Sequence, residues 1–240
     1  MSTAKIAEPT GSNTAVIPEL GTAWKYLDFV EILTGPTAFV SISQVNSLYD
    51  PEGAQADERQ WERGSLENTV KVATAARELG AHFFWIGYDI FRDEYFQSPM
   101  DASQYATWTE PFADWSEEKR RWDGDLPPAL RELVRPGDQE FFELALQSSF
   151  VGTPLELHLR RHGIRTLILT GCHLDWCIEG NARQARDLGY MPIVVADACA
   201  CEREQDEPAA MRRINNYFAP VMSADRAVEL IAEATERKGG

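Results

Sequence analysis

The stretch Leu167–Ala200 (LILTGCHLDWCIEGNARQARDLGYMPIVVADACA) constrains the fold of this chain more than any other part of the sequence. Its first apolar run ends at Gly171 and has the composition of a buried strand. After a short turn, a helix is expected from near Cys177 to Leu188-Gly189, where glycine can adopt the left-handed conformation that ends helices. The apolar run Ile193–Ala196 predicts a second strand. This order predicts two parallel strands joined by a crossover helix.

The same alternation extends over most of the chain. Strands are expected where β-prone or apolar runs are bounded by turn residues, and helices where apolar residues recur every three or four positions. The further expected strands are Thr37–Ser43, Ala81–Gly87, Gln139–Leu146 and Arg165–Thr170, and the further expected helices are Leu66–Leu79, Pro154–His162, Pro208–Tyr217 and Ala224–Lys238. This pattern predicts an α/β fold with a mostly parallel sheet, covered on both faces, whose ligands bind at the carboxyl ends of the strands.

Two segments depart from this alternation. Residues 1–35 are rich in Pro, Gly, Thr and Ser around one aromatic island, Trp24–Phe29, and predict an N-terminal arm that packs loosely or against a partner subunit. Residues 88–128 lack a clear period but are dense in aromatic side chains, which predicts a lid, a subunit contact or both. The expected organisation is an arm over 1–35 and a single α/β domain over 36–240.

The formal net charge of −15 at pH 7 and the isoelectric point near 4.7 exclude several classes of partner. Such a chain repels nucleic acid and anionic membrane surfaces, and no Lys/Arg cluster offsets the charge. The apolar stretches fall short of the roughly 20 residues that a membrane span needs, and the N-terminus has no signal-peptide pattern. We expect a cytoplasmic protein with a small-molecule substrate and with no nucleic-acid or membrane partner.

Cys177 is the strongest candidate for a reactive group, because it falls where the helix after Gly171 should start. Backbone N–H groups at a helix N-terminus favour a thiolate over a thiol, and they can donate to the oxyanion that forms when sulfur attacks a carbonyl. The alternative is that Cys177 is a small buried hydrophobic residue, the commoner role of a lone cysteine.

All four cysteines of the chain lie close together, and their spacing fits neither a secreted disulfide framework nor a Cys-x-x-Cys zinc site. They are Cys172, Cys177, Cys199 and Cys201. We expect four thiols, no metal and no cofactor.

A longer pattern surrounds Cys177. Its positions are Gly171, Cys177-Ile178, Ala182-Arg183-Gln184-Ala185, Leu188-Gly189-Tyr190 and Asp197-Ala198, with further positions upstream at Gly137-Asp138, Ser149-Phe150, Gly152-Thr153, Leu155 and His162-Gly163-Ile164. This pattern resembles the isochorismatase-like cysteine hydrolases, the group that contains nicotinamidases, N-carbamoylsarcosine amidases, and ureidoacrylate and biuret hydrolases. The resemblance implies a three-layer α/β/α sandwich, often dimeric or tetrameric, in which a cysteine attacks an amide-type carbonyl.

The resemblance also implies a catalytic Asp and a catalytic Lys, and neither is retained. The Asp position at the end of the first strand aligns with Ser43 or with Ile42, and neither side chain is a proton acceptor. The Lys position falls at Glu143 or Leu144, which supply no cation. Since that Asp takes the thiol proton and the Lys orients it, the usual acid–base route is lost.

Other side chains near these positions are candidate substitutes. Asp175, two residues before the cysteine, is expected to raise the pKa of the thiol by like-charge repulsion, to act as a displaced base, or to cap the following helix. His173 would form a nucleophile and base pair with Cys177 if its ring faces the sulfur. Glu143 and Ser43 complete the candidate catalytic set.

We expect a divergent cysteine hydrolase that cleaves the C–N bond of a small, planar or aromatic, amide-type substrate. The side chains expected to bind this substrate are those of Asn46, Trp108, Phe112, Trp115 and Trp176. The many aromatic residues also predict a homodimer or homotetramer, because aromatic side chains are enriched at buried subunit contacts. The alternative is a catalytically silent homologue that binds a small ligand or a protein partner through the same pocket.

Overall fold

The computed structural model describes residues 23–92, 98–142 and 147–239. Its centre is a six-stranded sheet in the order β3-β2-β1-β4-β5-β6, in which every neighbouring pair is parallel. The strands are β1 (Thr37–Ile42), β2 (His82–Ile86), β3 (Gln139–Phe141), β4 (Thr166–Cys172), β5 (Met191–Ala200) and β6 (Val221–Met222). The predicted parallel α/β fold is confirmed, although the short edge strand β6 was not predicted.

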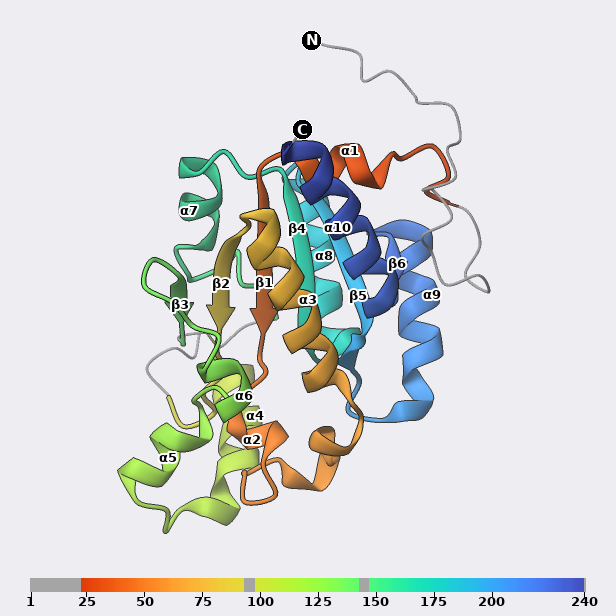
Figure 1. The fold of residues 1–240 in the computed structure, drawn as a ribbon. Coiled ribbons are helices and arrows are strands. Elements are labelled where there is room, and N and C mark those ends of the chain that lie inside the picture. Colours follow the sequence, from red (N-terminus) through yellow and green to blue (C-terminus); the bar gives the residue numbers. More distant parts are fainter. Residues whose placement is uncertain (1–22, 93–97, 143–146, 240) are drawn as a thin grey trace.

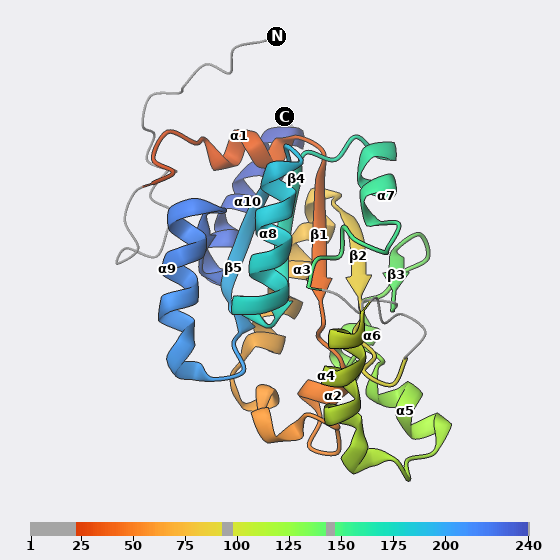
Figure 2. The same cartoon turned by 180° about the vertical axis from the view of Figure 1, so that it is seen from behind.

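Helices cover both faces of this sheet (Figures 1 and 2). One face carries α1 (Phe29–Thr34), α3 (Ser65–Leu79) and α10 (Ala224–Gly239), and the other carries α7 (Leu155–Arg161), α8 (Glu179–Asp187) and α9 (Glu207–Tyr217). Alternate residues of each strand enter opposite apolar cores, as the two-residue period of a strand requires. On β1, for example, Val40 packs in the core under α7 and α8, while Phe39 packs in the core under α3 and α10.

Short helices gather beyond the carboxyl ends of β1 and β2, at the lower edge of the sheet in Figure 1. They come from two loops and are α2 (Asn46–Tyr49), α4 (Pro99–Thr109), α5 (Glu117–Asp123) and α6 (Pro128–Arg131), with 3₁₀ turns at Ala56–Glu58, Gln60–Glu62 and Glu110–Phe112. Ser98 and Ser116 start α4 and α5 by accepting a backbone N–H at the N-cap position. The described part of the aromatic segment 88–128 therefore covers the edge of the sheet where ligands bind in parallel α/β folds.

The N-terminal segment is better packed than expected where the structure describes it. Asp28 caps α1 by accepting the N–H of Glu31, and Phe29, Val30 and Leu33 are buried in the same apolar core as α10. The prediction of a loosely packed arm is therefore wrong for Phe29–Thr34, because three apolar residues on one helix turn find a hydrophobic partner within the same chain. Residues 1–22 lie outside the described part.

Gly171 sets the distance between the two central strands. It lies opposite Ile42 in the β1–β4 register, with a φ of 132°. A Cβ at this position would approach the carbonyl oxygen of Ile42 to 1.9 Å, far inside van der Waals contact. Only glycine fits here, and the chain beyond it carries Cys177.

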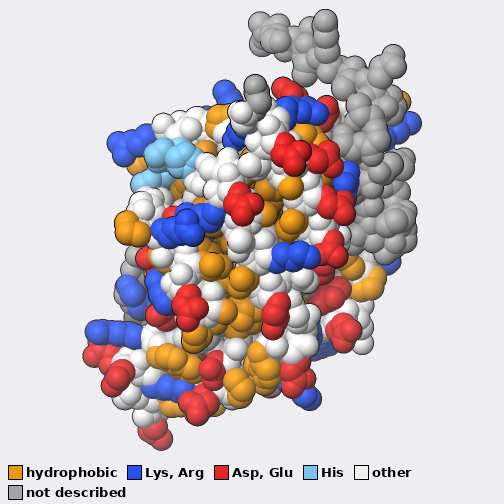
Figure 3. Space-filling view, viewed as in Figure 1, with side chains coloured by type: hydrophobic (Ala, Val, Ile, Leu, Met, Phe, Trp, Pro, Cys, Tyr) orange, Lys and Arg blue, Asp and Glu red, His pale blue; other side chains and the backbone are white. Residues whose placement is uncertain are grey.

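The surface over α3 and α10 mixes acidic and basic side chains (Figure 3). On the described part of this face, neither charge sign forms a large continuous area, although the whole chain has a net charge of −15. None of the helices in the described ranges combines the length and the apolar character needed to cross a membrane.

Candidate functional site

Cys177 lies just beyond the carboxyl end of β4, in a turn that is wider than an α-helical turn. A cis peptide bond joins Cys172 to His173, and a π-helical turn over Leu174–Ile178 then leads into α8. The cysteine was predicted at the start of an α-helix, but it lies inside this π turn, two residues before α8. Its side chain is buried, with 3% of the residue exposed.

Three hydrogen-bond donors face the Cys177 sulfur. The hydroxyl of Ser43 donates to it with Oγ and Sγ 3.9 Å apart, and the backbone N–H groups of His173 and Cys177 also bind it. Burial nevertheless raises the pKa of the thiol to about 11, because removing water disfavours the charged form more than these donors favour it. Asp175 raises this pKa further by charge repulsion, as predicted. The resting group is therefore a protonated thiol at neutral pH.

Ser43 is placed opposite Cys177 by the end of β1. Its N–H donates to the carbonyl of Ile86 at 2.7 Å, and its φ of 56° turns the chain out of the sheet. Of the two alignments considered from the sequence, Ser43 is the residue whose polar side chain meets the sulfur, whereas Ile42 is buried in the apolar core. A hydroxyl thus occupies the position next to the thiol.

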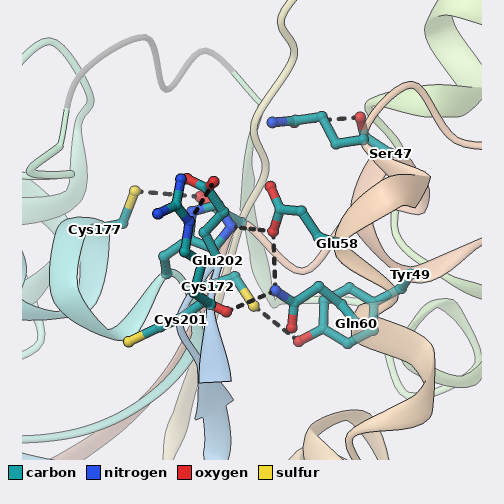
Figure 4. A network of polar contacts seen from close by, with 12 residues as sticks. Ser47, Tyr49, Glu58, Gln60, Cys172, Cys177, Cys201 and Glu202 are labelled. Carbon is teal, nitrogen blue, oxygen red and sulfur yellow. Dashed lines mark hydrogen bonds and ion pairs between the residues drawn. The ribbon is translucent and has the colours of Figure 1, made fainter. Parts of the chain in front are cut away.

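His173 does not form the predicted pair with Cys177. Its Nε2 lies 2.7 Å from Oε2 of Glu58, and both side chains are only 9% exposed. Its ring stacks on that of Trp176, with 9° between the ring planes. The imidazole is therefore directed to the loop after β1, while its backbone N–H serves the sulfur. Figure 4 shows Gln60 donating to the same carboxylate oxygen of Glu58.

The two other acidic candidates have different outcomes. Asp175 is exposed and lies inside the π turn, whose N-cap is His173 and has no capping side chain. The predicted helix cap at Asp175 is therefore wrong, because the wide turn moves the start of the helical geometry to His173. Glu143 lies outside the described residues.

A cavity of about 590 Å³ opens beside this turn. Trp108, Phe112 and Trp176, three of the residues expected to bind substrate, line it together with His173. Its opposite wall is the loop Gly53–Glu58 after β1, and Glu202 completes the rim. Trp115 is not among the described cavity-lining residues and packs on Phe112 and Phe91.

Four aromatic rings connect the cavity to the neighbourhood of the sulfur. Tyr88 contacts Tyr105, Tyr105 contacts Trp108, Trp108 contacts Trp176, and Trp176 contacts Tyr88, with ring centroids 5.1–6.5 Å apart. Burial raises the pKa of both tyrosines, and the charge of a Cys177 thiolate raises it further. Trp108 and Trp176 belong both to this ring set and to the cavity wall.

Asn46 supports this site from outside the cavity instead of lining it. Its Nδ2 donates to the carbonyl of Trp122 at 2.8 Å, and its N–H donates to the carbonyl of Asp125. Asp123 in the same segment accepts the N–H of Ala54 at 2.8 Å. Asn46 and Asp123 thus tie the aromatic segment to the loop after β1, and a contact of Asn46 with substrate stays a prediction.

Comparison with known proteins identifies the family. A family model described as the isochorismatase domain matches residues 37–226. The chain belongs to the isochorismatase family. The ureidoacrylate amidohydrolase RutB of Methylorubrum extorquens (strain DSM 6343 / CIP 106787 / DM4) is 36% identical over 170 residues, which cover 64% of this chain and 64% of that protein. The isochorismatase family protein YwoC of Bacillus subtilis is 39% identical over 124 residues, covering 50% of this chain and 56% of YwoC. The matched part of the chain thus spans 64% of RutB and 56% of YwoC.

Solved structures share the fold of this chain. A cysteine hydrolase from Pseudomonas syringae pv. phaseolicola 1448A superposes with a TM-score of 0.66 at 17% identity, covering 98% of this chain and all of that one. A pyrazinamidase/nicotinamidase from Streptococcus mutans UA159 superposes with a TM-score of 0.62 at 22% identity, covering 78% of this chain and 99% of that one. The predicted isochorismatase-like fold is confirmed.

Sequence reasoning missed several residues of this isochorismatase-family site. Glu58, Asp57 and Tyr88 follow β1 and β2 in segments without a recognisable motif, and Glu202 follows β5. Their only signal was position, since each comes after a strand whose carboxyl end faces the cavity. Within the described residues, no three His, Cys, Asp or Glu side chains are grouped as metal ligands.

Proposed function

We propose that this isochorismatase-family protein hydrolyses the C–N bond of a small, planar amide with Cys177 as its nucleophile. The observation that carries the proposal is the set of donors around the sulfur, namely the Ser43 hydroxyl and the N–H groups of His173 and Cys177. These donors stabilise negative charge where an attacking sulfur and the developing oxyanion need it. The neighbouring cavity has room and aromatic walls for a small planar substrate.

The names of two similar proteins support amide chemistry. One is an amidohydrolase, RutB, and the other is a pyrazinamidase/nicotinamidase with the same fold. In the proposed reaction the sulfur attacks the carbonyl carbon and forms a C–S bond. The C–N bond then breaks as the nitrogen takes a proton and leaves as ammonia or an amine. Water hydrolyses the resulting thioester to the carboxylic acid and regenerates the thiol.

The thiol proton needs an acceptor during attack. Ser43 offers a hydroxyl in place of the carboxylate that the family resemblance implies, and burial raises the pKa of Cys177 to about 11. The proton therefore passes to the leaving nitrogen, either directly or through the Ser43 hydroxyl, once the substrate fills the cavity. In this scheme the substrate supplies part of its own acid–base catalysis.

The second candidate function is ligand binding without catalysis. It is favoured by the same two features, the raised pKa of Cys177 and the hydroxyl at position 43. The two functions are separated by measuring amine or ammonia release from a panel of aromatic primary amides and anilides. We expect turnover by the wild type and by Cys199→Ala, a control that removes another buried thiol, and none by Cys177→Ala. Undiminished turnover in Cys177→Ala excludes the nucleophile, and binding without turnover supports the silent homologue.

A further inference from the structure

We propose that the cavity lined by Trp176, the chain neighbour of Cys177, selects a planar organic cation, such as an amidinium, a guanidinium or a protonated heteroaromatic ring, as the substrate's recognised part. This inference rests on the proposed function of the same site and names the charge of its substrate. It follows from three properties of the cavity: its aromatic walls, its carboxylates and the lack of Lys or Arg among its described lining residues.

The aromatic walls come from two sides of the cavity. Trp108 and Phe112 come from α4 and the turn after it, and Trp176 comes from the π turn that holds Cys177. Indole and phenyl faces carry negative partial charge, so they attract planar cations as well as apolar groups. The cavity volume of about 590 Å³ suits a small molecule and is too small for a macromolecular ligand.

Three carboxylates give the cavity wall a negative charge. Asp57, Glu58 and Glu202 all line the cavity, whereas no Lys or Arg is among its described lining residues. Glu58 is the best placed of the three, because its side chain is 9% exposed and its charge is little screened by water. His173 and Gln60 both contact its Oε2. A ligand N–H in the cavity would form a charge-assisted hydrogen bond with this carboxylate.

Substrates of other charge fit this lining less well. A carboxylate ligand would meet Asp57 and Glu58, with no Lys or Arg among the described lining residues, and Glu202, whose carboxylate pairs with Arg203 at 3.7 Å. A neutral amide would use the aromatic walls but would bring no positive charge to the carboxylates of Asp57 and Glu58. A cation interacts favourably with both the aromatic walls and the carboxylates. Its charge near the turn of Cys177 also favours the thiolate, because the described residues around that sulfur supply hydrogen-bond donors but no cation.

The test compares three probes of the same shape and different charge. Benzamidinium, benzamide and benzoate are titrated by calorimetry into the Cys177→Ala protein, so that turnover does not interfere. We expect benzamidinium to bind at least tenfold tighter than benzamide, and benzoate to bind more weakly than benzamide. Equal or tighter binding of benzamide overturns the inference.

Matched variants locate the binding. Glu58→Gln should weaken benzamidinium at least fivefold and change benzamide less than twofold. Glu62→Gln, in the adjacent turn but outside this cavity, removes the same charge and should change neither. Trp108→Leu should weaken benzamidinium, and Trp115→Leu, which replaces a ring of the same segment outside the cavity, should not. Equal losses in Glu62→Gln or Trp115→Leu would mean that the probe responds to overall charge or to another surface, and would overturn the inference.

The experiments distinguish a failure of the cation inference from a failure of the proposed hydrolysis. If aromatic amides are turned over in a Cys177-dependent manner but benzamidinium does not bind preferentially, the cation inference fails and the proposed function stands. If benzamidinium binds as expected but no amide or amidine is hydrolysed, the proposed function fails and the cavity remains a cation-binding site.

Discussion

The hydroxyl of Ser43 lies 3.9 Å from the sulfur of Cys177, across a sequence separation of 134 residues. The ends of β1 and β4, which are hydrogen-bonded neighbours in the sheet, bring the two residues together. A hydroxyl at this place can donate a hydrogen bond to the sulfur, but unlike a carboxylate it is not a base that takes up the thiol proton. Ser43 can therefore stabilise a Cys177 thiolate once it has formed, but it does not remove the proton from the thiol. The fraction of thiolate should then depend on pH.

The alkylation rate of Cys177 should report this contact. With a thiol pKa of about 11, the rate with iodoacetamide should rise about tenfold per pH unit from pH 7 to 10. Ser43→Ala removes a donor to the thiolate, raises the pKa of Cys177 further, and should slow alkylation about threefold at each of these pH values. Mass spectrometry of the Cys177 peptide measures both rates. A rate that levels off near pH 8 would show an activated thiolate and contradict the resting state described here.

Asp123 should make stability depend on pH. Burial raises the pKa of its carboxyl from the ordinary value of 3.8 to about 6, although the N–H of Ala54 donates to this carboxyl and lowers its pKa. Because the folded pKa lies above the unfolded one, its contribution to stability is present below pH 4 and is lost as the pH rises through 6. The loss is at most about 3 kcal/mol for a buried group.

Asp123→Asn keeps an acceptor for the Ala54 N–H and removes this titration. Relative to the wild type, the variant should therefore gain stability between pH 4 and pH 7, as measured by urea unfolding at each pH. Asp114→Asn, which replaces an exposed carboxylate of the same segment, serves as the control. Identical pH profiles for Asp123→Asn and the wild type would contradict the prediction.

The sequence was informative where the site depends on neighbouring residues in the chain. Gly171 and Cys177 lie within one strand–turn–helix unit, so their order alone placed the cysteine at the sheet edge, and strand alternation predicted the parallel sheet. Glu58 was missed because its role depends on His173, 115 residues away, and no local pattern encodes that distance. The turn around Asp175 was misjudged because a π turn and an α turn have similar sequences.

Replacing Gly171 should damage the fold itself. The Cβ of Gly171→Ala would lie 1.9 Å from the Ile42 carbonyl oxygen, and two central backbones cannot separate without breaking the β1–β4 ladder. We expect a loss of more than about 3 kcal/mol, or no folded protein, by urea unfolding. Gly189→Ala is the control, because it has a positive φ of 87° but open space around the new Cβ; its cost should be about 1 kcal/mol. Equal costs would show that the close approach is unimportant.

Self-association remains a prediction for this chain. Large apolar side chains are exposed at Met100, Leu157 and Tyr217, with 60–76% of each residue accessible. Such residues are common at subunit contacts when they gather on one face. Light scattering at micromolar protein should give the mass of a dimer or larger assembly. A 27 kDa monomer that persists as the concentration rises would contradict this expectation.

Rapid-quench mass spectrometry of the intact protein tests the role of Cys177 most directly. Wild-type protein is mixed with an aromatic amide that it turns over, and the reaction is stopped with acid within the first turnover. The proposed mechanism predicts a species heavier by the mass of the acyl group, localised to the Cys177 peptide, and absent from Cys177→Ala but present in Cys199→Ala. Turnover that continues in Cys177→Ala, with no acyl group on Cys177 in the wild type, would contradict it.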